Sequence, residues 1–295
     1  MADFDIQRFV SLSRAVDLSD IDWEEAARVG VTDDEHQVLR YMADTEAHTI
    51  LYMRDLLAGH TARDPEVTTF LAVWVYEETH HGLALDRFLT AVGRPPPPGN
   101  FTEVTAGAHF MEEVEAFFTQ SLPKLTRHFS ATQMAWGAVN EATAAAAYTA
   151  LARTTANRQL AKLVTKLARD ERRHYSFYYH QAQKRIGHPL ARLLARTALH
   201  LFWGPVGIGV GGSREVIELI FAKYFADAAG QAEMAHIEEK IRELPGLESF
   251  ERLTDWRSRC VTNFARREPE HFARLTAEAA TAALSAPPPP PQASA

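Results

Sequence analysis

Apolar residues recur at every third or fourth position along most of this chain, which is the spacing of amphipathic α-helices. We find no alternation of strand and helix patterns of the kind that builds a parallel sheet. The pattern therefore predicts an all-α protein. Five long helices are expected, at residues 33–58, 65–93, 103–122, 130–153 and 157–187.

Turn and cap residues divide the chain into four predicted parts. Residues 1–31 are an N-terminal extension, residues 32–187 hold the long helices, residues 188–285 add further helices, and residues 286–295 are a disordered proline-rich tail. The run Pro95–Pro98 predicts an extended connector, and Gly204–Gly212 predicts a loop. The additional helices are expected at 189–203, 214–243, 247–266 and 269–284.

Composition narrows the class of protein. Of the 295 residues 46% are hydrophobic and 23% are charged, as in ordinary globular proteins. The net charge of -7 argues against a nucleic-acid partner, because nucleic-acid binders carry a basic excess. The single cysteine, Cys260, excludes an intramolecular disulfide framework and a cysteine-rich metal site. No signal peptide and no membrane span is evident, so we expect a soluble, cytoplasmic protein.

The motif Glu-x-x-His occurs five times, and the helix face on which each copy lies distinguishes them. Residues three or four apart share a helix face. Glu78 with His81, and Glu171 with His174, each interrupt an otherwise apolar face, so both pairs are predicted to point inward. The remaining copies are predicted to be exposed polar pairs: Glu77/His80, Glu233/His236 and Glu268/His271.

Two further glutamates, Glu46 and Glu141, lie on apolar faces of the helices that precede these pairs. A buried carboxylate is costly unless it is paired, protonated or bound to a metal ion. We see no inward lysine or arginine nearby in the sequence, so four inward glutamates and two histidines call for cations. Carboxylate and imidazole ligands suit iron or manganese better than a structural zinc ion.

The spacing of these residues predicts a single shared site. Glu46 precedes the first helix turn by as many residues as Glu78 follows it, so at about 1.5 Å per residue both lie at one level of the hairpin. In the second half Glu141 lies 16 residues before Asn157 and Glu171 lies 14 residues after it, so these two are roughly level as well. Two copies of helix-with-Glu followed by helix-with-Glu-x-x-His form the ligand set of ferritin-like di-iron and di-manganese bundles. We therefore predict a ferritin-like four-helix bundle with additional C-terminal helices.

The same motifs resemble a known family over roughly residues 33–187. The segment Trp74–Gly82 resembles the Glu-Glu-x-x-His-Gly motif of soluble acyl-carrier-protein desaturases, and Arg169–His174 resembles their Asp-Glu-x-x-His motif. The resemblance implies that Asp170 orients the ligand His81, and it loosely matches Trp23 with a tryptophan implicated in electron delivery. It implies six metal ligands: Glu46, Glu78, His81, Glu141, Glu171 and His174.

The resemblance also implies a function. A desaturase of this family uses two iron ions (manganese is the alternative), O2 and electrons from a ferredoxin-like donor to introduce a double bond into an acyl chain. The acyl substrate is carried by an acyl carrier protein, and the enzyme is a homodimer. Where the plant enzymes have a threonine linked to oxygen handling, this chain has Ala144, with Thr143 adjacent.

Several interpretations stay open at this point. Related di-iron oxygenases hydroxylate or oxidise specialised metabolites, although the N-oxygenases among them carry a histidine where this chain has Leu167. A ferroxidase or iron-storage bundle and a non-enzymatic helical module are further alternatives. Basic residues along residues 157–187 could dock an acidic carrier or form a solvated face: Lys162, Lys166, Arg169, Arg172 and Arg173. Inward side chains could line a substrate tunnel or simply form core: Met42, Met53, Trp74, Met134 and Tyr148.

Overall fold

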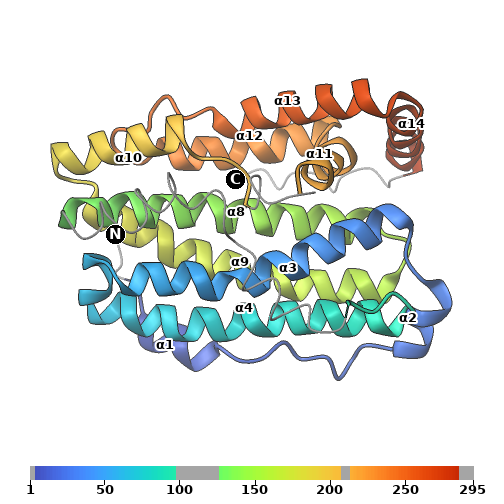
Figure 1. Cartoon of the computed structure of the whole chain (residues 1–295), viewed down its shortest axis with the longest axis horizontal. Coiled ribbons are helices and arrows are strands. Elements are labelled where there is room, and N and C mark those ends of the chain that lie inside the picture. The colour runs from blue at the N-terminus through green and yellow to red at the C-terminus, as the bar shows by residue number, and fades with distance from the viewer. Residues whose placement is uncertain (1–3, 98–125, 207–212, 286–295) are drawn as a thin grey trace, which may run out of the picture.

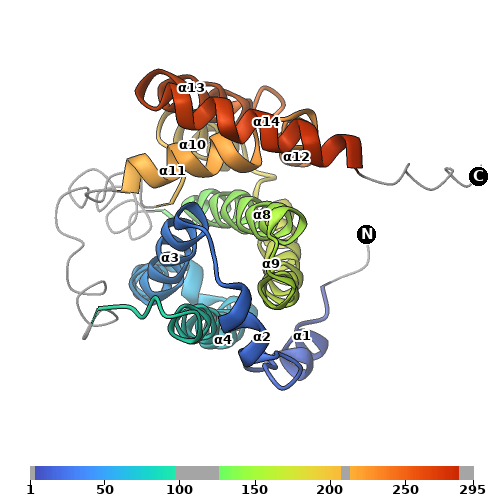
Figure 2. The same ribbon diagram turned by 90° about the vertical axis from the view of Figure 1, so that its right-hand side faces the viewer.

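Four long antiparallel helices form the body of the protein, for which a computed structural model describes residues 4–97, 126–206 and 213–285. Helix α3 (Asp33–Leu57) is joined to α4 (Pro65–Ala91) through the short 3-10 helix η1 (His60–Arg63), and α8 (Ser130–Thr154) is joined to α9 (Arg158–Arg185). Figure 2 shows the four helices around one common axis. The described residues are helical without strands, so the predicted all-α bundle is confirmed.

Local caps explain why these helices begin where the sequence predicts. Thr32 and Glu35 form a capping box at the start of α3, in which each side chain accepts a hydrogen bond from the other residue's backbone N–H. Asn157 accepts bonds from the first N–H groups of α9, and its amide donates to the carbonyl of Gly30, 2.9 Å away. The cap of α9 thereby also fixes the chain segment that leads into α3.

A glycine sets the distance between α8 and α9. A Cβ atom on Gly137 would lie 2.5 Å from the ring of Tyr178, a separation that real Cβ atoms do not show. The missing side chain therefore lets the two helices approach closely, and Tyr178 is fully buried against α8. This close contact holds α8 and α9 in a constant register, which positions the polar residues that both helices carry further along.

The C-terminal third forms a second layer of helices that covers α8 and α3 on one side of the bundle (Figures 1 and 2). Trp203, which follows the first of these helices, is buried and donates a hydrogen bond from Nε1 to Asn140 on α8. Lys223 and His271 both contact Asp34 at the start of α3, each at 3.0 Å. The layer consists of α10 (Pro189–Leu201), α11 (Ser213–Tyr224), α12 (Ala228–Arg242), α13 (Arg252–Arg267) and α14 (Pro269–Ser285).

Two expectations about this layer are wrong. Residues 214–243 do not form one helix, because the chain turns between α11 and α12. Asp227 caps α12, and Gly230 lies so near the preceding turn that a Cβ atom there would be 2.3 Å from Cα of Phe225. The next helix begins at Arg252 rather than near residue 247, because the preceding residues form turns in which Gly246 has a φ of 93°.

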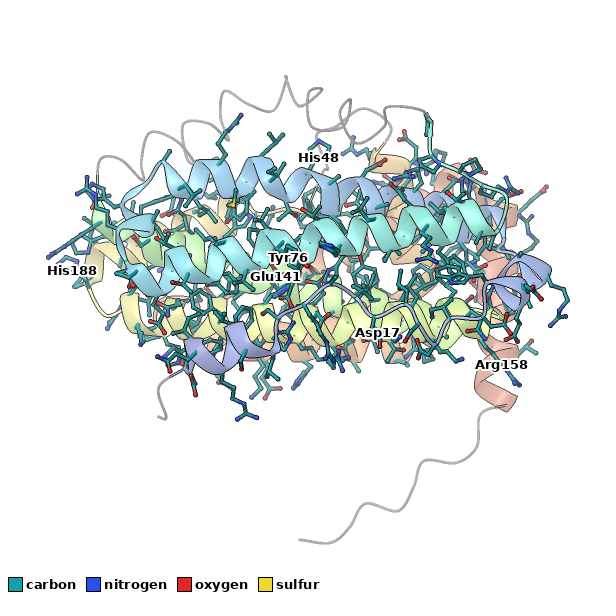
Figure 3. The ribbon with its side chains drawn as sticks, turned by 90° about the horizontal axis from the view of Figure 1, so that it is seen from below. Asp17, His48, Tyr76, Glu141, Arg158 and His188 are labelled. Carbon is teal, nitrogen blue, oxygen red and sulfur yellow. The ribbon has the colours of Figure 1, made fainter. Side chains whose placement is uncertain are left out.

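The N-terminal part contains two short helices, α1 (Ile6–Leu12) and α2 (Trp23–Val29), with an extended segment between them. This segment runs along α9, as the position of Asp17 in Figure 3 shows. Nζ of Lys166 donates to the backbone carbonyl of Asp17 at 2.6 Å and pairs with Asp20. A basic residue expected on the open face of α9 is therefore already engaged by the chain's own acidic segment.

Several sequence-based predictions lie outside the described residues. These are the helix at 103–122, most of the loop at Gly204–Gly212 and the tail at 286–295. Residues 94–97 have no regular secondary structure, so the part of the proline-rich connector that is described is not helical. Within the described ranges no helix has the length and apolar character needed to cross a membrane.

Candidate metal centre

Six acidic and imidazole side chains meet inside the bundle. Figure 3 shows Glu141, one of them, at about the middle of the bundle. Each comes from the helix face that the sequence pattern assigned to the interior, and none is more than 7% exposed. The six are Glu46 on α3, Glu78 and His81 on α4, Glu141 on α8, and Glu171 and His174 on α9.

The six side chains fall into two overlapping groups, each of which could hold a metal ion. In the first group, one ligand atom from each of Glu46, Glu78, His81 and Glu171 lies within 4.8 Å of all the others. In the second group the same is true of Glu78, Glu141, Glu171 and His174. Glu78 and Glu171 belong to both groups. Among the described residues no further cluster of this kind is found.

The two imidazole rings turn the same nitrogen toward the cluster. Nδ1 of His81 lies 3.0 Å from Glu171 and 3.7 Å from Glu78. Nδ1 of His174 lies 2.9 Å from Glu78 and 3.3 Å from Glu171. Nδ1 is therefore the ring atom available as a ligand, whereas Nε2 of each ring points away from the cluster.

Carboxylates from the opposite helix face the outer nitrogens in a crosswise pattern. Nε2 of His174 on α9 lies 2.9 Å from Oε2 of Glu77 on α4. Nε2 of His81 on α4 lies 3.6 Å from Oδ2 of Asp170 on α9, a separation typical of an ion pair and too long for a hydrogen bond. Asp170 thus faces the histidine that the resemblance assigned to it. Such outer carboxylates fix the tautomer and orientation of ligand histidines.

The prediction that Glu77 is exposed is wrong. Glu77 is fully buried, and besides His174 it contacts the guanidinium of Arg173 at 2.5 Å. Arg173 also contacts Asp170 at 3.1 Å, so one arginine joins both outer carboxylates. Arg173 therefore turns toward the site instead of forming part of an open basic face. The expectation that no basic side chain lies near the cluster is wrong.

The cluster holds more negative charge than its own histidines balance. Burial and the neighbouring charge of Glu78 raise the pKa of Glu46 well above its ordinary range. Burial lowers the pKa of His81, but the neighbouring carboxylates of Asp170, Glu171 and Glu78 outweigh it and raise the pKa well above its usual value. The site therefore retains protons that exposed groups would release at neutral pH. A bound cation can replace those protons.

Unpaired buried atoms in the described part of the chain provide a test of whether metal ions fit this site. Neither ring nitrogen of His81 is aligned for a hydrogen bond, and the same holds for Oε1 of Glu78 and Oε1 of Glu171. Buried polar atoms without partners are rare in folded proteins, because each costs about 1–3 kcal/mol. Buried oxygen and nitrogen atoms that converge on one point without being aligned for hydrogen bonds are a suitable ligand set for divalent iron or manganese.

Tyr148 is a further polar neighbour of the cluster. It is 1% exposed, and its hydroxyl donates a hydrogen bond to Oε1 of Glu46. Burial and the charge of Glu46 raise the pKa of Tyr148 well above its usual value, so the hydroxyl keeps its proton and remains a donor. The sequence placed Tyr148 on the inner face of α8, but it did not identify this contact.

Several other residues named from the sequence belong to neither ligand group. His236 is 61% exposed, and His271 contacts Asp34, so neither completes a metal site. The guanidinium carbon of Arg87 lies 4.4 Å from the centroid of the Trp23 ring. Trp23 also packs against Phe88 near the C-terminal end of α4. Trp74 and Met134 belong to the buried core.

The chain was also compared with models of known protein families, with curated proteins and with solved structures, and none of these comparisons finds a match.

Proposed function

We propose that this protein is an O2-dependent oxidoreductase whose centre is a pair of iron or manganese ions. The observation that supports this proposal is the overlap of two buried four-ligand groups that share Glu78 and Glu171. In this proposal Glu46 and His81 complete the ligands of one ion, and Glu141 and His174 complete those of the other. Bound iron would supply the oxygen chemistry that protein side chains lack.

The chain's own residues would orient the ligands and exclude water. Glu77 would accept a hydrogen bond from the Nε2–H group of His174, which leaves the Nδ1 lone pair directed into the site. The Tyr148 hydroxyl holds one oxygen of Glu46 in place. Burial of all six ligand side chains keeps bulk water away from the centre.

The reaction that we propose is the desaturation of an acyl chain, on the basis of the resemblance between the two Glu-x-x-His segments and those of acyl-carrier-protein desaturases. Electrons would come from a ferredoxin-like donor, and the substrate would be a carrier-bound or free acyl group. The alternative is hydroxylation or another oxidation of a specialised metabolite by a similar centre. The half-buried pair Thr143 and Ala144 favours neither reaction by itself.

Metal analysis of the purified chain tests the centre itself. We expect about two iron or manganese ions per chain. Substituting alanine for Glu46 or Glu141 should remove about one ion, whereas the same change at Glu78 or Glu171 should remove both, because these two residues serve both groups. Glu24→Ala, at an exposed position on α2, is the matched control. Equal metal content in all five variants and the original chain would contradict the proposal.

Product analysis tests the reaction. The reduced, metal-loaded protein should be incubated with O2, ferredoxin and a panel of acyl substrates, and the products analysed by mass spectrometry. Desaturation predicts products that are two hydrogen atoms lighter than the substrate. Products that carry an added oxygen atom would instead support the alternative oxygenase.

A further inference from the structure

An apolar cavity lies between the bundle and the C-terminal layer and reaches the candidate metal centre. Its volume is about 110 Å³, and Glu46 and Tyr148 form part of its wall. The opposite wall comes from α11 and α12, through side chains such as Ile217, Phe221 and Met234. The cavity therefore lies between the C-terminal helices, which carry no recognisable motif, and a residue that is proposed to bind metal.

Small side chains on α8 create this space. Thr143, Ala144 and Ala147 line the cavity and remain half-buried, although their side of α8 is covered by the C-terminal layer in Figure 2. The Thr143 hydroxyl donates to the carbonyl of Asn140 at 2.8 Å, and the Thr45 hydroxyl donates to the carbonyl of Tyr41 at 2.9 Å. Both hydroxyl protons are used within their own helices, which suits the cavity to an apolar ligand.

The size of the cavity limits what can occupy it. An apolar cavity of about 150 Å³ in another protein is large enough to bind benzene. The present cavity is partly open, and by this comparison its enclosed part holds a group of about four or five carbon atoms. A reaction in the middle of a long acyl chain needs room on both sides of the reacting carbon, and this cavity does not provide that room within the described residues.

We infer that the cavity binds the part of the substrate that is oxidised, and that this part is a compact apolar group rather than the middle of a long acyl chain. This inference rests on the proposed function, because Glu46 is both a proposed metal ligand and a wall of the cavity. The C-terminal helices thereby set the substrate specificity. Ala147 is a small residue that lines the cavity, so a larger side chain there should reduce the volume.

Calorimetric titration with straight-chain 1-alkanols from butanol to dodecanol tests the inference on the full chain, both metal-free and metal-loaded. The affinity should rise about fourfold with each methylene that enters the cavity, and then level off after about four or five carbons. Ala147→Leu should weaken hexanol binding at least tenfold. Ala152→Leu, at a half-buried position on the same helix that does not line the cavity, should leave it unchanged.

A second variant keeps the test decisive should Ala147→Leu fail to fold. Phe221→Ala enlarges the cavity, so the levelling should shift to alkanols that are longer by several carbons. An affinity that climbs steadily through dodecanol in the original chain, or an Ala147→Leu variant that folds and binds hexanol like the original, would overturn the inference. Alkanol binding to the metal-free chain does not depend on ions. A failure of metal binding would thus be seen separately, as an altered metal content.

Discussion

Single residues outside the ligand set determine how the two histidines point. Glu77 and Asp170 each precede the glutamate of a Glu-x-x-His motif, and each faces the histidine of the other motif across the bundle. The two halves of the centre are therefore interlocked. Arg173 contacts both outer carboxylates and balances part of their charge.

This arrangement predicts that Glu77→Gln and Asp170→Asn weaken metal binding without removing a ligand. Each change should lower the metal affinity by about 10–100-fold, because a histidine loses the carboxylate that orients it. Competition with a chelator of known affinity measures the effect. At saturating metal both variants should still bind about two ions, and the exposed Glu24→Gln control should match the original chain. A lower maximal content in either variant would mean that the residue is itself a ligand.

Helix ends and close contacts determine where each element lies. The sequence predicts the four bundle helices to within a few residues. Thr32, Pro65 and Asn157 mark the starts of three of them, whereas α8 begins without a side-chain cap. The break between α11 and α12 is missed because Gly230 reads as a tolerated glycine within a helix. Its actual role depends on a contact with Phe225 that no local pattern encodes.

Gly230→Ala should therefore destabilise the protein. The added Cβ atom would meet the backbone of Phe225 at 2.3 Å, so the turn between α11 and α12 must shift, at a cost of about 1–3 kcal/mol or more. Urea unfolding monitored by circular dichroism measures the free energy of unfolding. Gly187→Ala is the matched control, because a Cβ atom there meets nothing within 4 Å. If the two variants are equally stable, the proposed clash is absent.

At the scale of the whole molecule, the bundle and the C-terminal layer are held together by contacts between distant parts of the chain. Asp34 at the start of α3 contacts Lys223 of α11 and His271 of α14. Burial raises the pKa of Asp34, but hydrogen bonds from Lys223 and His271 outweigh it and hold the pKa below its ordinary value of 3.8. The charged carboxylate therefore stabilises the folded protein.

Asp34→Asn should lower the free energy of unfolding by about 1–3 kcal/mol at pH 7, because two partly buried charge-assisted contacts are lost. A carboxyl whose pKa is lowered by folding stabilises the protein above its ordinary pKa, and this contribution is lost as the pH falls through the folded-state value. The difference between the variant and the original chain should thus shrink as the pH falls below 3.8. Asp255→Asn, at a side chain that is 54% exposed, should have little effect at any pH.

The sequence was sufficient for the convergence of the six candidate ligands, and it was not sufficient for their surroundings. Helical spacing places Glu46 level with Glu78, and Glu141 level with Glu171, whatever the details of packing. The burial of Glu77 was missed because it depends on α9, which contributes His174 and Arg173 from across the bundle. The cavity could not be predicted because its walls join residues that are far apart in sequence.

The division of the cavity wall between two regions of the chain has a consequence for how such a protein can diversify. The candidate ligands lie between residues 46 and 174, whereas α11 and α12 begin after residue 212. Exchanges in those later helices can reshape the space beside Glu46 while the ligand geometry stays intact. Relatives that share the centre and differ in these helices would then accept different molecules while keeping the same chemistry.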